Sequence, residues 1–213
     1  MRPPFQFLVR PMGGVRYQAT KKIAGTDFIM NSSQEDHTTT NRLAIVVSTP
    51  ITYEGDIKKG DTLLVHHNVF RKYYDIRGRE SSGPSFFMDD LFLIDYDQFF
   101  LYKSKDTWQA PDPYCFVKPI DKTHNPLKTD ATEQELVGII RYGNHTLDDR
   151  GISEGDLISF QPESEYEFTI EGEKLYRMFT KNICILLSHG SKKDKRGDNK
   201  SRRASRKAAN QGS

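Results

Sequence analysis

The sequence predicts an all-β protein built from two tandem, partly open β-barrel units. Its apolar segments are short and rich in β-branched and aromatic residues, which is typical of strands. Turns containing Gly and Asp separate them, and no stretch of about a dozen residues shows the 3.6-residue apolar period of a helix. Three blocks of sequence occur twice in the same order, which indicates a duplicated unit.

The first unit is expected over residues 5–104. Its clearest strands are predicted at residues 5–10, 43–47, 62–65, 85–88 and 99–102. In Lys59-Gly60-Asp61, Gly provides the positive φ of a tight turn and Asp accepts hydrogen bonds from nearby backbone N–H groups. A short helical turn is expected near Tyr96–Gln98. Residues 13–41 are rich in Gly, Ser, Thr, Asn and charge, which predicts a mobile surface loop.

The second unit is expected over residues 114–188. Its strands are predicted at residues 115–117, 136–140, 157–160, 166–170 and 183–187. Its loop at 121–135 is short and contains Leu127 as its one large apolar residue. Residues 105–113 include two prolines and are interpreted as a short, stiff linker between the units.

The duplication is visible in three pairs of segments. Val9-Arg10-Pro11 parallels Val117-Lys118-Pro119, each an apolar residue followed by a base and a proline. The other pairs are residues 55–65 with 150–160, and residues 91–102 with 175–186. A shared order across three blocks indicates two homologous β-domains.

Composition places the chain in a reducing, aqueous compartment. The mean hydropathy is −0.68 and no apolar run approaches 18 residues, so no membrane association is expected. The N-terminus lacks the apolar core of a secretion signal, which favours the cytoplasm. The two cysteines, Cys115 and Cys184, are too few for a disulfide framework and are interpreted as small buried core residues.

The near-neutral net charge of +2 conceals a strongly basic C-terminus. Residues 189–213 contain nine Lys and Arg against two Asp, whereas the rest of the chain contains 22 basic and 27 acidic residues. This segment has too few apolar residues to fold and is predicted to be a disordered tail. It either binds nucleic acid or an acidic surface, or serves as a solubilising extension. The basic residues are Lys192, Lys193, Lys195, Arg196, Lys200, Arg202, Arg203, Arg206 and Lys207.

Nothing in the sequence points to catalysis. No metal-ligand spacing, nucleophile elbow, phosphate loop or dinucleotide motif occurs, so no enzyme activity, metal or cofactor is expected. His66 and His67 are adjacent on a predicted strand, where their side chains should point to opposite faces and not share a metal.

The duplicated blocks resemble the GroES-type co-chaperonins (chaperonin-10 family). The resemblance is strongest over residues 152–160, continues through Tyr166-Glu167-Phe168 and residues 172–178, and reaches Asn182–Ile185. Residues 57–65 match the same frame in the first unit, and the two Val-base-Pro segments are similar to the start of the family fold. Tandem forms of this fold occur in plastids and divergent single-domain forms in bacteriophages, and the low similarity favours a phage-encoded protein acting in a host cytoplasm.

The resemblance implies a co-chaperonin that assembles into a ring and caps a GroEL-type chaperonin. An apolar segment of the flexible loop after the first strand would dock on the chaperonin, which would itself bind ATP. From the residues alone, apolar side chains in this polar loop either fold back onto the domain or bind a partner. The docking residues implied by the resemblance are Ile23, Gly25, Phe28, Ile29 and Met30. The second unit, with its short loop, would act as a spacer.

Two other interpretations belong to different functional classes. One is a virion or other structural protein that reuses the GroES-like barrel, with the basic tail contacting nucleic acid. The other is a nucleic-acid-binding barrel, for which residues 70–84 supply four basic residues interleaved with Tyr73 and Tyr74. The alternative for residues 70–84 is a solvated hairpin.

Overall fold

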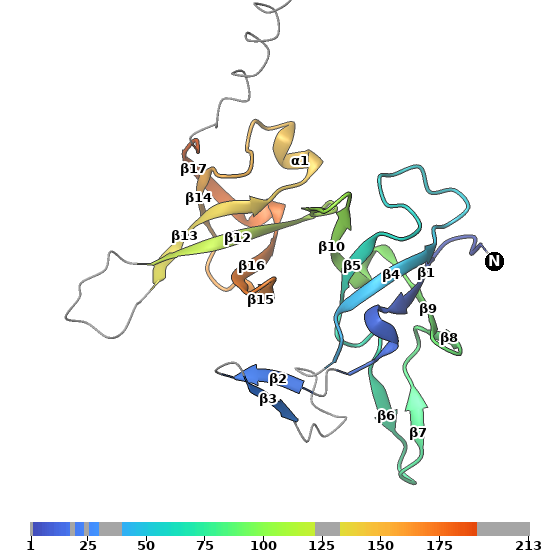
Figure 1. Cartoon of the computed structure of the whole chain (residues 1–213). Helices are drawn as coiled ribbons and strands as arrows, with labels where there is room; N and C mark the ends of the chain where they lie inside the picture. The colour runs from blue at the N-terminus through green and yellow to red at the C-terminus, as the bar shows by residue number, and fades with distance from the viewer. Residues whose placement is uncertain (1, 18–19, 24–25, 30–39, 122–132, 191–213) are drawn as a thin grey trace, which may run out of the picture.

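The protein is predominantly β, as the sequence predicts, and its strands form antiparallel sheets. A computed structural model describes residues 2–17, 20–23, 26–29, 40–121 and 133–190 (Figure 1). Two large sheets account for most of the strands, and two short hairpins, β2–β3 and β6–β7, form separate two-stranded sheets. Within the described residues, no helix is long and apolar enough to cross a membrane.

The first large sheet has seven strands in the order β11-β10-β5-β4-β1-β9-β8. The strands are β1 (Phe7–Pro11), β4 (Leu43–Ser48), β5 (Thr62–Val65), β8 (Phe86–Met88), β9 (Leu91–Ile94), β10 (Phe99–Ser104) and β11 (Thr107–Gln109). Two single-turn 3-10 helices accompany them, η1 (Met12–Gly14) after β1 and η2 (Tyr96–Gln98) before β10. The second of these is the helical turn expected from the sequence.

The second large sheet has six strands in the order β15-β16-β12-β13-β14-β17. The strands are β12 (Tyr114–Asp121), β13 (Glu133–Tyr142), β14 (Leu157–Phe160), β15 (Tyr166–Ile170), β16 (Glu173–Phe179) and β17 (Ile183–Ser188). A one-turn helix, α1 (His145–Asp148), follows β13, and a 3-10 turn, η3 (Thr180–Asn182), precedes β17. The Asn144 side chain caps α1 by accepting a hydrogen bond from the Leu147 N–H at 3.0 Å.

The two sheets share one topology. Without β11, the first reads β10-β5-β4-β1-β9-β8 and the second reads β17-β14-β13-β12-β16-β15, so each strand has a counterpart. The register agrees residue by residue: Val9 pairs with Val46 as Val117 pairs with Ile140, and a register shift precedes both pairs. Each described sheet retains two edge strands, so neither is a closed barrel.

The Gly-Asp turns are also the same in both halves. Gly60 and Gly155 have φ values of +95° and +93°, a conformation that side chains disfavour. The Oδ2 atoms of Asp61 and Asp156 accept the backbone N–H three residues earlier, at 2.8 and 2.9 Å. These aspartates therefore act as structural turn residues, as the sequence predicts.

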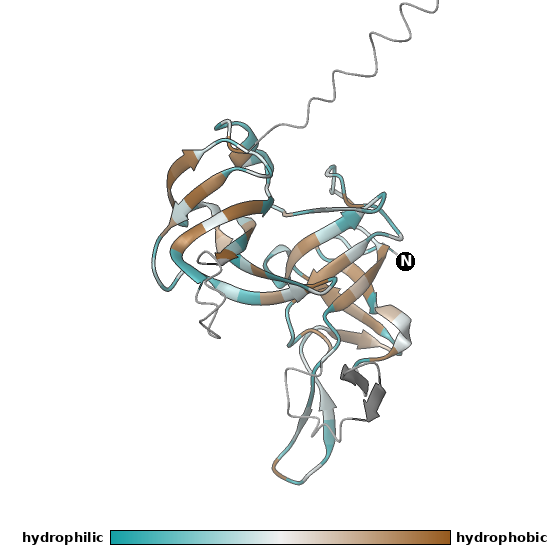
Figure 2. Ribbon diagram, turned by 60° about the vertical axis from the view of Figure 1, so that its left-hand side comes forward, coloured by the Kyte–Doolittle hydropathy of each residue, from teal (hydrophilic) through white to brown (hydrophobic). Residues whose placement is uncertain are grey.

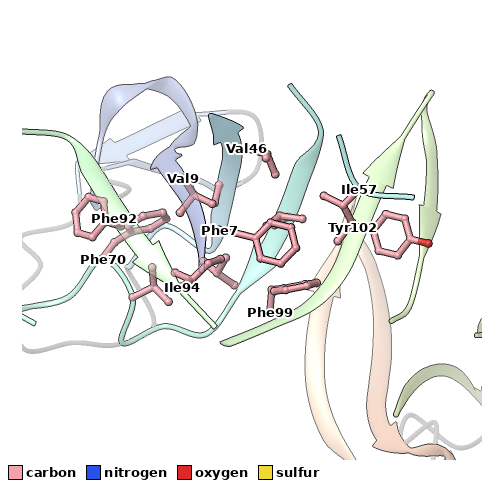
Figure 3. Packing of buried hydrophobic residues seen from close by; sticks show 13 residues of the cluster. Phe7, Val9, Val46, Ile57, Phe70, Phe92, Ile94, Phe99 and Tyr102 are labelled. Carbon is pink, nitrogen blue, oxygen red and sulfur yellow. The ribbon is translucent and has the colours of Figure 1, made fainter. Parts of the chain in front are cut away.

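Alternating apolar residues of the first sheet form a compact aromatic core (Figure 3). Phe7 lies at its centre, with ring centroids 5.0 Å from Tyr53 and 5.4 Å from Phe99 in edge-to-face geometry. Phe70 and Phe92 form a second edge-to-face pair at 4.8 Å. Each fully buried side chain of this kind contributes about 1.5–3 kcal/mol. Figure 2 shows the hydrophobic residues concentrated on the strands of both sheets.

A separate core joins the two sheets. Phe100 of β10 packs edge-to-face on Tyr114 and Phe168 of the second sheet, at 5.2 and 5.7 Å. The segment expected as a linker, residues 105–113, contributes β11 and two buried residues, Trp108 and Ala110, to this cluster. The joint is therefore packed, and the two units share buried surface in addition to their chain connection.

Candidate functional site

The candidate site is the insertion between β1 and β4, residues 12–42, whose two ends are fixed together on the first sheet. Tyr17 and Thr40 form an antiparallel β-bridge. Next to it, the Asn41 N–H donates to the carbonyl of Arg16 at 2.9 Å. These contacts close the insertion at its base. The centre of the insertion therefore projects from a defined point of the sheet.

The Asn41 side chain, which is 3% exposed, completes this base. Its Nδ2 donates to the carbonyls of Met12 and Val15 at 2.9 and 2.8 Å, and its Oδ1 accepts the Leu43 N–H at 2.9 Å. One buried amide thus satisfies three backbone groups where the chain leaves η1 and enters β4.

Arg16 ties the base to the neighbouring hairpin. Its guanidinium donates to the carbonyls of Phe70 and Arg71 at 2.8 and 3.2 Å, and to Ser82 Oγ at 3.0 Å. It also lies over the Phe92 ring, 5.1 Å from the centroid. Burial holds the pKa of Arg16 below its usual value, although the group remains a cation.

The insertion, which the sequence predicts as a loop, contains a two-stranded hairpin, β2 (Thr20–Ile23) and β3 (Thr26–Ile29). Of the predicted docking residues, Ile23 ends β2, and Phe28 and Ile29 end β3. Gly25 and Met30 lie outside the described residues. The cross-strand pairs are Thr20–Ile29, Lys21–Phe28, Lys22–Asp27 and Ile23–Thr26.

A second hairpin, β6 (Lys72–Tyr74) and β7 (Glu80–Ser82), leaves the first sheet at the same end (Figure 1). The Lys72 N–H donates to the Tyr17 hydroxyl at 2.6 Å, which joins the bases of the two hairpins. Lys72 also pairs with Glu80 at 2.6 Å. At the turn, Asp75 accepts two backbone N–H groups, and the side chain of Ile76 is fully exposed at 103%.

The prediction for His66 and His67 is wrong. Strand β5 ends at Val65, so the alternation of faces does not extend to these residues. Their rings instead lie together, with centroids 4.1 Å apart. Among the residues that the structure describes, no group of three or more His, Cys, Asp or Glu side chains could hold a metal ion.

The two cysteines differ in environment, which partly contradicts the sequence interpretation. Cys115 is fully buried, and burial raises the pKa of its thiol to about 12. Cys184, in contrast, is exposed on the edge strand β17. Only Cys115 is the buried core thiol that was expected.

The basic tail residues, 192–207, lie outside the described residues. The first two residues of the predicted tail are in place, because the Asp156 carboxylate contacts both. Its Oδ1 accepts the Gly190 N–H at 2.8 Å, and its Oδ2 lies 3.3 Å from His189 Nδ1. Burial acts to raise the pKa of Asp156, but these contacts and the Ser153 N–H outweigh it and hold the pKa below its usual value.

No protein-family model matches the chain, and no significant match occurs among curated proteins.

Proposed function

We propose that this protein is a non-enzymatic co-chaperonin of the GroES type, which caps a GroEL-type chaperonin by docking the insertion at residues 12–42. One observation carries the proposal: the two units share one topology, and the loop between the first two strands of each large sheet is the one whose length differs most between them. Between its first two strands, the first unit has residues 12–42, whereas the second has residues 122–132. The second unit shows that a short loop is sufficient to join these two strands. Long loops in compact domains are uncommon and often functional, so we assign the function to residues 12–42.

The closed base supports docking through the centre of this insertion. The Tyr17–Thr40 bridge and the Asn41 hydrogen bonds fix both ends before a partner binds. Fixing the ends lowers the conformational entropy that binding must remove. The apolar residues Ile23, Phe28 and Ile29 stand in the hairpin beyond this base, and Gly25 and Met30 complete the segment.

Each docking segment of this size binds weakly, so the proposed cap depends on several copies. A ring that presents one insertion per chain converts later contacts into intramolecular ones, which raises overall affinity by orders of magnitude. The second unit, packed onto the first through Phe100 and Trp108, acts as a rigid spacer in such a ring.

The test is co-elution with a GroEL-type chaperonin in size-exclusion chromatography, with and without ATP. We expect nucleotide-dependent co-elution that is lost in Ile29→Asp. The matched control is Thr20→Asp, which places the same charge at the cross-strand partner of Ile29. Co-elution that survives Ile29→Asp, or that requires no nucleotide, argues against docking through this segment.

A second candidate, the virion or structural protein, is favoured by the nine basic residues of the tail, which the co-chaperonin proposal leaves unused. This function predicts retention on DNA at low salt, loss of retention when residues 191–213 are deleted, and no chaperonin binding. The same chromatography with DNA in place of chaperonin separates the two candidates.

A further inference from the structure

A small cavity, partly open to solvent, lies at the joint between the two sheets and has an unusual lining. Its volume is about 90 Å³, enough for one tetrahedral oxyanion or a few waters. Four of its seven lining residues are arginines or histidines, and the other three are aromatic. The residues are Arg42, His66, His67, Phe100, Tyr166, Phe168 and Arg177.

Arg177 of β16 is a cation held by aromatic rings. Its guanidinium carbon lies 4.7 Å from the Phe100 centroid, 5.2 Å from Tyr114 and 5.4 Å from Tyr166. Aromatic faces attract a cation without neutralising it. Within the described part of the chain, no carboxylate lies within 4.0 Å of Arg177, and its buried Nε has no hydrogen-bond partner.

The duplication shows that the fold does not need this arginine. Arg177 pairs with Phe116 in the second sheet, and the equivalent pair in the first sheet is Leu93 with Leu8. A leucine therefore serves at the same position of the same topology. The arginine occurs in the copy where this position contacts Phe100 of the other sheet.

The first unit supplies the other arginine and both histidines of the cavity, next to the ends of β4 and β5. Arg42 lies over the Phe168 ring at 4.7 Å, and His66 stacks on His67. The Asn68 N–H donates to His66 Nδ1 at 3.2 Å, so the neutral imidazole carries its proton on Nε2 as a donor. Burial, followed by the charges of Arg42 and Arg177, lowers the pKa of His66 against the opposing effect of Asp97.

We propose that this cavity is a binding site for a phosphate group. Arg42 and Arg177 supply two cations from different sheets, and neutral His66 adds a hydrogen-bond donor, which together match a doubly charged oxyanion. Tyr166, 43% exposed at the rim, provides a face on which the base of a nucleotide can stack. Occupancy of the site bridges the two units through one ligand.

The test follows the histidine ring signals of the full-length protein by NMR during titration with inorganic phosphate and with a nucleoside monophosphate. We expect the His66 signals to shift and to saturate, while His145, which lines the separate cavity beside Asp112, stays unchanged. Tighter binding of the nucleotide, lost in Tyr166→Ala, identifies a nucleotide as the source. Equal affinities for inorganic phosphate and for the nucleotide identify free phosphate as the ligand.

The decisive variant is Arg177→Leu, which installs the residue of the first unit. It should weaken phosphate binding about ten-fold or more, the change that follows from losing ~1.4 kcal/mol of interaction. Arg42→Gln should do the same, whereas Arg10→Gln, on the exposed side of β1, should bind like the wild type. Unchanged Trp108 fluorescence verifies that the joint is intact. Absence of a saturable His66 shift, or equal binding by Arg177→Leu and the wild type, overturns the proposal.

Discussion

Replacing Phe100 by alanine should destabilise both units together, because Phe100 is the ring through which the two sheets meet. The side chain is 5% exposed and contacts Tyr114, Phe168 and Arg177 of the second sheet. Truncation of a buried Phe costs about 3–5 kcal/mol, and loss of the cation–π contact adds ~0.5–1 kcal/mol. At roughly 2–4 °C per kcal/mol for a chain of this size, the melting temperature should fall by ~7–24 °C.

Two probes of urea unfolding test this reasoning. Fluorescence of the single tryptophan, Trp108, reports on the joint, and far-UV circular dichroism reports on both sheets. We expect coincident transitions that shift equally in Phe100→Ala. Phe5→Ala, which removes a ring that is 82% exposed, should shift neither. Separate transitions, or a Phe100→Ala shift in fluorescence alone, would refute a shared core.

Three further predictions concern the insertion base, the Gly-Asp turn and the thiols. Asn41→Ala removes three hydrogen bonds to backbone groups and should lower the free energy of unfolding by ~2–3 kcal/mol, measured in urea. Asp156, whose pKa is lowered in the fold, stabilises the protein above about pH 4 and loses this effect as pH falls through its folded pKa. Asp156→Asn should therefore flatten the acid limb of a stability–pH curve, and an unchanged limb would contradict the assignment. A thiol reagent should label Cys184 rapidly and Cys115 only on unfolding, whereas two fast thiols in the native protein would be inconsistent with a buried Cys115.

The parts of the fold that depend on residues close together in the sequence could be predicted. The alternation in Tyr166–Ile170 and the Gly60 and Gly155 turns are local signals, and they appear in the structure as strand β15 and as residues with positive φ. The repeat could also be detected, because equivalent positions keep the same residue types. Val9 and Val117 are one example, and both are fully buried opposite equivalent partners.

Contacts between distant segments were beyond sequence reasoning. The sequence predicts a linker around Trp108, because a three-residue strand beside two prolines has no periodic pattern. The burial of Trp108 depends on residues of the second sheet, which are distant in sequence. The cavity around Arg177 likewise corresponds to no sequence motif, because its lining residues are far apart in the chain. Its lining comes from segments near residues 42, 66, 100, 166 and 177, which only the folded topology brings together.

The errors at His66 and Cys184 have local causes. The alternation of faces was applied to His66 and His67 although the preceding strand ends at Val65, and beyond that end the two rings lie together. Cys184 was expected inside because its neighbours are apolar, but β17 is an edge strand on which Ile185 and Leu187 are also about half exposed. Apolar character alone does not determine which side of an edge strand is buried.

Hydrogen exchange of the protein alone and in the presence of a GroEL-type chaperonin with ATP tests the central claim most directly. The proposed function predicts new protection within residues 12–42 and no change at residues 122–132, because only the first unit carries the docking segment. The Ile29→Asp variant should show no such protection. Protection that falls on residues 122–132 or on the basic tail, or no protection anywhere, would contradict a co-chaperonin that docks through the insertion of its first unit.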